Sequence, residues 1–181
     1  MITRWLVAAT TAATLAAAAG CNSSEPSAEP GSTRPPADSA TTNARTAAER
    51  NALAAYTGMW QAVAEAGEVP DPDAQKLRQY AADRALARLV DVLFTYRETG
   101  VATRGRPTSH PRVTSANPAE TPTEVAVDDC GDSTNWTKHK KATGELIPND
   151  PRGRRHITAV VKVVDGTWKV VSFEAGDIGT C

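Results

Sequence analysis

The chain has 181 residues, and its 20 Lys and Arg side chains nearly balance its 21 Asp and Glu side chains, so the net charge at pH 7 is −1. This balance excludes the basic footprint of a nucleic-acid-binding protein and a polybasic membrane patch, and no nucleic acid is expected as a partner. Arg is far commoner than Lys and Ala is abundant, a composition that suggests a high-GC genome and a Gram-positive source with a single membrane.

The chain begins with the pattern of an export signal. Residues 1–4 carry one positive side chain, Arg4, and residues 5–19 form an uncharged apolar run interrupted by threonines. This run has the length of a signal-peptide hydrophobic region and is shorter than the roughly 20 residues that a membrane-spanning helix needs. No later apolar run is long enough to span a bilayer. Residues 1–20 are therefore expected to be a removable signal peptide.

Small residues directly precede Cys21 in the run Leu-Ala-Ala-Ala-Ala-Gly-Cys at positions 15–21. This run resembles the lipobox of bacterial lipoproteins, with Ala18 where that family usually has Leu. The resemblance implies cleavage before Cys21 and a diacylglycerol on its thiol. Since two acyl chains give stable anchoring, membrane lipid is the expected partner of Cys21, on the extracytoplasmic face of the cell membrane. The alternative is an ordinary secretory signal with a cysteine near the cleavage point.

Residues 22–45 are rich in Ser, Pro, Ala, Thr, Glu and Gly and contain no aromatic side chain and no aliphatic side chain larger than Ala. Such a segment cannot bury enough surface to offset its ordering entropy. The expected organisation is a signal peptide at 1–20, a lipidated cysteine with a disordered tether at 21–45, and one folded domain at 46–181.

The folded domain is expected to begin with a long helix. Thr46 and Glu49 have the spacing of a capping box, and apolar residues then recur at helical intervals until Gly67. Tyr56 and Trp60 are large side chains for one helical stripe. They are expected to pack against a sheet, with the alternative that they line a pocket.

Two further helices are expected before residue 100. Asp71 or Asp73 is expected to cap a short helix around Leu77 and Tyr80. Residues 83–99 then form a strongly amphipathic pattern that ends at a glycine. The charged side chains of this last helix are expected on its solvated face; they are Arg84, Arg88 and Asp91.

The remainder of the chain has the pattern of an antiparallel sheet. Strands are expected at residues 110–116, 124–130, 154–164 and 167–175, with a continuation of the second at 133–139 after a break at Gly131. The first of these is expected at a sheet edge because Pro111 cannot donate to a ladder. Residues 140–153 are polar and are expected to form an exposed loop.

Asp165 and Gly166 lie between two β-branched runs, which is a strong short-range signal for a hairpin. Strict alternation assigns the faces of its two strands. On the first strand Ile157, Ala159, Val161 and Val163 share a face, and on the second Val171, Phe173 and Ala175 lie opposite Trp168, Val170 and Ser172. The helices must cover one face of the sheet.

Cys130 and Cys181 remain as an even pair if Cys21 is acylated. In an oxidising compartment these two are expected to form a disulfide. A metal site or a reactive thiol is the alternative, but neither cysteine has a neighbouring Cys or His at ligand spacing. No metal and no cofactor is therefore expected.

A fold resemblance is carried by short segments along the domain. They are Ala-Tyr-Thr-Gly-Met-Trp at 55–60, Tyr-Ala-Ala-Asp-Arg-Ala-Leu at 80–86, Pro-Arg-Val-Thr at 111–114, Val-Asp-Asp-Cys at 127–130, Gly-Thr-Trp-Lys-Val at 166–170 and Gly-Thr-Cys at 179–181. With three helices before the strands, residues 46–181 resemble the nuclear-transport-factor-2-like fold and, more closely, small secreted actinobacterial lipoproteins of that architecture. The resemblance implies an α+β domain in which a curved antiparallel sheet wraps over helices to form a cone.

The same resemblance includes isomerases and dehydratases, which use a pocket Asp or His as a base, often with a Tyr. Here Asp128 and Asp129 are adjacent in a strand and are expected to face opposite sides. None of His110, His139 and His156 is expected to pair with a carboxylate. The chain has no glycine-rich phosphate loop and no Gly-x-Ser-x-Gly motif. An enzyme is therefore not expected.

Two functions remain from the sequence. The first is a membrane-anchored, extracytoplasmic, non-enzymatic module that binds an envelope protein or a wall component. The alternative is a small apolar ligand held in the cone pocket, with a predicted lining of Tyr56, Trp60, Leu89, Val161 and Phe173. An isomerase or dehydratase is the outsider, which a cavity holding a desolvated Asp or His would favour.

Overall fold

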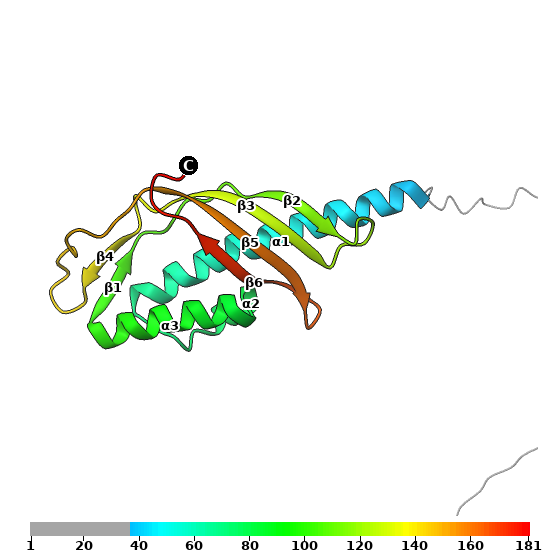
Figure 1. The fold of residues 1–181 in the computed structure, drawn as a ribbon. Coiled ribbons are helices and arrows are strands. Elements are labelled where there is room, and N and C mark those ends of the chain that lie inside the picture. Colours follow the sequence, from blue (N-terminus) through cyan, green and yellow to red (C-terminus); the bar gives the residue numbers. More distant parts are fainter. Residues whose placement is uncertain (1–36) are drawn as a thin grey trace, which may run out of the picture. The chain divides into compact units, whose positions relative to one another are not determined.

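The computed structural model describes residues 37–181, in which three helices precede six strands (Figure 1). The elements are α1 (Ala37–Glu68), α2 (Gln75–Tyr80), α3 (Asp83–Thr99), β1 (Val101–Arg104), β2 (Arg112–Asn117), β3 (Glu124–Asp132), β4 (Thr137–Lys140), β5 (Arg154–Val164) and β6 (Thr167–Ala175). This is the α+β class that the sequence predicts. The predicted signal peptide and Cys21 lie outside the described residues.

The strands form a four-stranded antiparallel sheet of order β2-β3-β5-β6 and a separate antiparallel pair, β1-β4. The position of β2 at an edge agrees with the prediction from Pro111. The predicted break at Gly131 is wrong, because β3 continues through this residue to Asp132. The segment expected to continue that strand forms β4 instead and pairs with β1.

The β5–β6 hairpin turns where the sequence predicts. Asp165 and Gly166 have φ values of 50° and 75°, as a two-residue turn with both central residues in the left-handed region requires. The strict alternation expected for β6 is wrong, because Val160 pairs with Ser172 while Val161 pairs with Val170. Val171 is therefore an extra residue in β6 and forms a β-bulge, which interrupts the alternation between the two faces. Val170 and Phe173 are consequently both buried in the core.

The long helix α1 begins at Ala37, earlier than the sequence predicts. Residues 37–45 were expected to belong to the tether, but they are helical, in keeping with their alanines and with the absence of proline between Pro36 and Pro70. Thr46 therefore lies inside the helix and does not cap it. Helix α1 also passes through Gly67 and ends one residue later.

The two shorter helices lie where they are expected. The predicted cap of α2 is wrong, since Ala74 occupies the N-cap position without a side-chain hydrogen bond, and Asp71 accepts a hydrogen bond from the backbone N–H of Asp73. Helix α3 ends at Gly100, whose φ of 66° is the left-handed cap that the glycine predicts. None of the helices within residues 37–181 combines the length and hydrophobicity of a membrane span.

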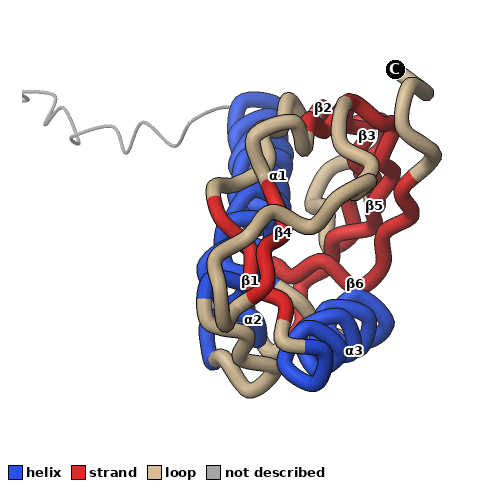
Figure 2. The backbone as a smooth tube through the Cα atoms, turned by 90° about the vertical axis from the view of Figure 1, so that its left-hand side faces the viewer, coloured by secondary structure: helices blue, strands red, loops and turns tan. Residues whose placement is uncertain are grey.

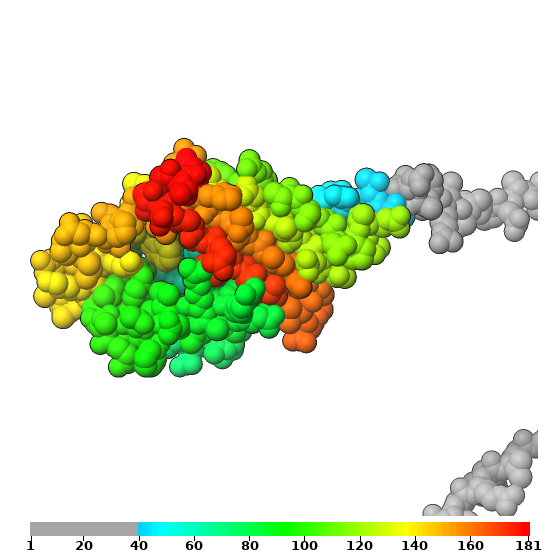
Figure 3. Space-filling model, in the orientation of Figure 1, coloured from blue at the N-terminus to red at the C-terminus, as the bar shows by residue number. Residues whose placement is uncertain are grey.

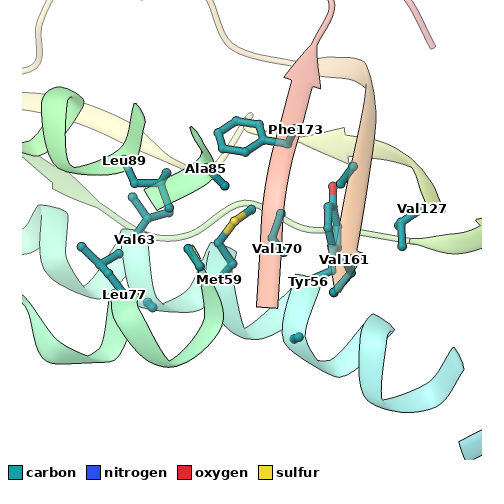
Figure 4. Close-up of a cluster of buried hydrophobic side chains, with 14 of the residues drawn as sticks. Tyr56, Met59, Val63, Leu77, Ala85, Leu89, Val127, Val161, Val170 and Phe173 are labelled. Atoms are coloured by element: carbon teal, nitrogen blue, oxygen red, sulfur yellow. The ribbon is translucent and has the colours of Figure 1, made fainter. Parts of the chain in front are cut away.

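The hydrophobic core lies between the helices and the sheet (Figure 4). Met59 from α1 and Val170 from β6 are fully buried and face one another in this cluster. Helix α2 reaches the core through Leu77 and crosses α1 at Gly58, where an added Cβ would lie 2.5 Å from the Tyr80 ring. The stripe that includes Tyr56 and Met59 thus packs against the sheet, as the sequence predicts.

A disulfide joins Cys130 on β3 to the C-terminal Cys181, with a Cα–Cα distance of 5.9 Å. The segment that precedes Cys181 also hydrogen-bonds to β5. The backbone N–H of Gly179 donates to the carbonyl of Arg154, and the Thr180 hydroxyl accepts from the backbone N–H of His156. The C-terminus is therefore attached to the sheet by the disulfide and by hydrogen bonds to β5.

Removing this disulfide is expected to destabilise the domain. The two cysteines are 51 residues apart, and a loop of this length corresponds to roughly 4 kcal/mol of unfolding free energy in the chain-entropy model. The double variant Cys130→Ser/Cys181→Ser should unfold at lower denaturant concentration than the wild type. Reductant should lower the wild-type midpoint toward that of the variant and leave the variant unchanged. A wild-type midpoint that ignores reductant would contradict the pairing.

Candidate functional site

A cavity of about 230 Å³ opens between α1, α3 and the inner face of the sheet. Figure 2 shows α1 and α3 facing the sheet across this interior, with β1 and β4 closing one side. In the space-filling view the surface is hollowed between α3, in green, and the C-terminal segment, in red (Figure 3). The interior is thus not completely filled by side chains.

Most of the cavity wall is apolar and aromatic. Trp60 contacts two other aromatic rings edge to face, with centroid distances of 5.4 Å to Phe173 and 6.4 Å to Trp136. The aliphatic part of the wall comes from both long helices and from β5; its members are Val63, Leu89, Val92 and Ile157. Edge-to-face rings hold one another in place, so this wall is firmly supported.

The predicted lining residues divide into two groups. Trp60, Leu89 and Phe173 lie in the cavity wall. Tyr56 and Val161 are fully buried in the core and do not line the cavity. Val161 pairs with Val170 across the hairpin, and both side chains belong to the buried core between the sheet and the helices. Binding by these residues stays a prediction.

Asp129 is a buried carboxylate in the wall, with an exposed fraction of 3%. One oxygen accepts a hydrogen bond of 2.9 Å from the Tyr56 hydroxyl, and the other accepts one of 2.6 Å from the backbone N–H of His110. Asp129 forms no ion pair with any residue of the described domain. Two neutral donors therefore replace the water that this carboxylate loses.

Tyr56 remains a hydrogen-bond donor under all ordinary conditions. Burial, and next the negative charge of Asp129, raise the pKa of the Tyr56 phenol far above its ordinary value. The indole N–H of Trp60 lies close enough to oppose this rise in pKa but forms no hydrogen bond of normal geometry. The Tyr56 hydroxyl is thus committed to Asp129 and is not available to a ligand.

One ion pair between β4 and the following loop also shapes the cavity. Lys138 binds Asp150 at 2.7 Å, and Asp150 has an exposed side-chain fraction of 6%. Burial works to lower the pKa of Lys138, but the hydrogen bond to Asp150 holds it above its usual value. The prediction that residues 140–153 form an exposed loop is therefore wrong for this part, because the loop folds over the cavity and buries its carboxylate.

Arg88 lies on the exposed side of α3, as the sequence predicts, but it also contacts the sheet. Its guanidinium lies 4.8 Å from the centroid of the Phe173 ring and donates a hydrogen bond of 3.1 Å to the Phe173 carbonyl. This stacking places the Arg88 side chain along the cavity wall.

Several buried polar atoms of the wall have no hydrogen-bond partner in the described part of the chain. They are Trp60 Nε1, Trp136 Nε1, Thr103 Oγ1 and Arg152 Nε. The Thr103 hydroxyl lies against Gly67, where an added Cβ would be 2.3 Å away. Buried polar groups are nearly always satisfied, so a cluster of unpaired donors points to something that completes it, such as a ligand or ordered water.

A second charged cluster lies on the opposite face of the sheet. Asp128 pairs there with both His156 and Arg112. The hydrogen bond from His156, and next that from Arg112, lower the pKa of Asp128. Asp128 and Asp129 thus face opposite sides, as predicted. The expectation that no histidine pairs with a carboxylate is wrong for His156, because the β3–β5 pairing makes it a neighbour of Asp128.

Sequence reasoning missed several cavity residues. Asp129 has the same parity in its strand as the buried Val125 and Val127, and Arg155 the same parity as Ile157. This parity could have assigned both charged residues to the inner face. Arg152 lies in a loop and carries no such signal.

Within residues 37–181, no cluster of three or more His, Cys, Asp or Glu side chains could hold a metal ion.

Comparison with known proteins supports the fold only. No family model matches the chain, and no curated protein matches its sequence. The intermembrane space region of the chloroplast protein ARC6 matches with 13% identity and a TM-score of 0.51, over 70% of this chain and 95% of that one. A Nostoc punctiforme PCC 73102 protein of unknown function with a cystatin-like fold matches at 9% identity and a TM-score of 0.41, over 70% and 87% of the two chains. The ARC6 similarity supports helices packed on a curved antiparallel sheet.

The hydrogen bond between Tyr56 and Asp129 gives a direct test of this site. Tyr56→Phe removes one of two donors from a buried carboxylate, which should lower the free energy of unfolding by about 1–3 kcal/mol. Tyr80→Phe is the matched control, because the Tyr80 hydroxyl makes no hydrogen bond within the described domain, and it should change stability by less than about 0.5 kcal/mol. Urea unfolding measures both. Equal losses from the two variants would argue against a stabilising bond at Asp129.

Proposed function

We propose that this domain is a binding protein for a small, largely apolar molecule, which it holds in the cavity between the helices and the sheet. The observation that carries the proposal is the open space of about 230 Å³ behind a wall of edge-to-face aromatic rings. Apolar cavities with a few convergent polar groups are the usual form of small-molecule sites. A filled interior would have argued against this function.

The proposed location is the extracytoplasmic face of a membrane, through a lipid on Cys21. Its support is the lipobox-like sequence at 15–21, since this part of the chain lies outside the described residues. The Cys130–Cys181 disulfide is in keeping with an oxidising compartment. An envelope protein or wall component remains an alternative partner, but the cavity gives the small-molecule function a specific physical basis.

The cavity can be tested with two aromatic probes of similar size, 2-naphthamide and 2-naphthoate. At least one should bind saturably and quench tryptophan fluorescence, because Trp60 and Trp136 are in the wall. Val92→Phe extends a ring into the cavity from α3 and should weaken binding at least about tenfold, more than the loss of a few apolar contacts.

Val69→Phe is the matched control for this variant. Val69 has an exposed fraction of 66% and lies outside the cavity, so its replacement should leave probe binding unchanged. If neither probe binds the wild-type protein, the proposed function is wrong.

A second candidate is an enzyme that abstracts a proton next to a carbonyl group, and the buried Asp129 favours it. A carboxylate in the wall of a cavity can act as a general base when it lies within hydrogen-bond reach of the proton that it abstracts. The test is exchange of the α-protons of 2-tetralone in deuterium oxide, followed by NMR. An enzyme of this kind should catalyse the exchange, and Asp129→Asn should abolish it. Exchange at the buffer rate would eliminate the candidate and leave the binding function in place.

A further inference from the structure

The charged side chains in the cavity wall are unequally matched. Four are cationic, namely Arg88, Lys138, Arg152 and Arg155, and two are anionic, namely Asp129 and Asp150. Arg88 is held by the Phe173 carbonyl and Lys138 by Asp150. Asp129 accepts its hydrogen bonds from neutral donors. Neither carboxylate in the wall therefore neutralises Arg152 or Arg155.

The guanidinium groups of both arginines lack a hydrogen-bond or ion-pair partner among residues 37–181. For Arg152 the Nε atom is also buried. A guanidinium always carries its charge and offers its donors in a fixed planar arrangement. A buried donor without an acceptor is costly, so the unpaired Nε of Arg152 indicates a missing acceptor at this cavity, where Arg155 is a second unmatched guanidinium.

The fold brings Arg155 to the cavity by strand pairing. Arg155 lies opposite Gly131 in the β3–β5 ladder and has the same parity as the buried Ile157 and Ala159. Successive side chains alternate between the two faces of a strand, so Arg155 lies on the inner face. Gly131 has no side chain there, and an added Cβ would meet Ile157 at 2.7 Å. The glycine thus allows the Ile157 side chain to pack closely against β3 on the inner face.

We propose that the ligand carries one carboxylate, which Arg152 and Arg155 bind, and that its apolar body lies against Trp60, Trp136 and Phe173. This inference rests on the proposed function and names its ligand class. Arginine is the preferred partner of a carboxylate because its fork of donors matches the two oxygens. The carboxylates of Asp129 and Asp150 in the same wall disfavour a multiply charged anion such as a diphosphate.

The size of the cavity limits the apolar body. A dry apolar cavity of about 150 Å³ holds a benzene molecule. The present cavity, of about 230 Å³, therefore accommodates a body of the size of two fused rings. The ligand class is thus a small aromatic or compact aliphatic carboxylic acid.

The test compares 2-naphthoate with its neutral amide, 2-naphthamide, on the wild-type protein by isothermal titration calorimetry. The two probes have the same ring system and differ in charge. The acid should bind at least about tenfold more tightly, which is the lower end of the effect of hydrogen bonds to a charged group. This comparison needs no variant and so does not depend on the folding of one.

The double variant Arg152→Gln/Arg155→Gln should remove this preference by weakening binding of the acid at least about tenfold while leaving the amide within about twofold. The single variant Arg155→Gln should lose part of the preference. Arg106→Gln is the matched control for the single variant, because Arg106 is exposed beside the wall residue Pro107 and its replacement changes the net charge as much as Arg155→Gln does. It should retain the preference.

The outcomes separate this inference from the proposed function. Equal binding of the acid and the amide by the wild type, or a preference that survives in the double variant, overturns the inference and leaves the binding function standing. Binding of neither probe overturns both. If Arg106→Gln loses the preference to the same extent as Arg155→Gln, the inference is also overturned, because the effect would then come from general electrostatics.

Discussion

The hydrogen bond between Tyr56 and Asp129 is the interaction on which the site depends. A carboxylate on the inner face of β3 would be too costly to bury without donors, and Tyr56 from α1 supplies one of them. The bond joins the longest helix to the middle of the sheet at the level of the cavity. Because the bonds to Asp129 come from neutral donors, Asp129 does not pair with Arg152 or Arg155 of the same wall.

The cavity exists because the side chains around it support one another and do not collapse inward. Trp60 contacts Phe173 and Trp136 edge to face, and Arg88 stacks on the outer side of the same Phe173 ring. Gly131 contributes no side chain at the point where β3 passes the cavity. A rigid aromatic wall gives space that is preorganised for a ligand, and preorganisation lowers the entropic cost of binding.

Long-range connections complete the enclosure. The loop between β4 and β5 lies over the cavity, fixed by the ion pair between Lys138 and Asp150. The C-terminus returns to β3 through the Cys130–Cys181 disulfide, on the face of the sheet opposite the cavity. The charged groups on the two faces therefore serve different purposes: Asp128 and His156 pair with each other on the outer face, whereas the inner face has guanidiniums that remain unmatched.

Elements with local signals could be predicted from the sequence. The Asp165–Gly166 turn and the end of α3 at Gly100 follow from backbone conformations that few residues adopt. Apolar periodicity places Trp60, Leu89 and Phe173 on inward-facing sides of their elements, and all three lie in the cavity wall. The tertiary structure was needed to find the bulge in β6, the pairing of His156 with Asp128, and the presence of Arg152 and Arg155 in the wall of one cavity. These depend on strand register and loop path, which join residues distant in sequence and leave no periodic pattern in the chain.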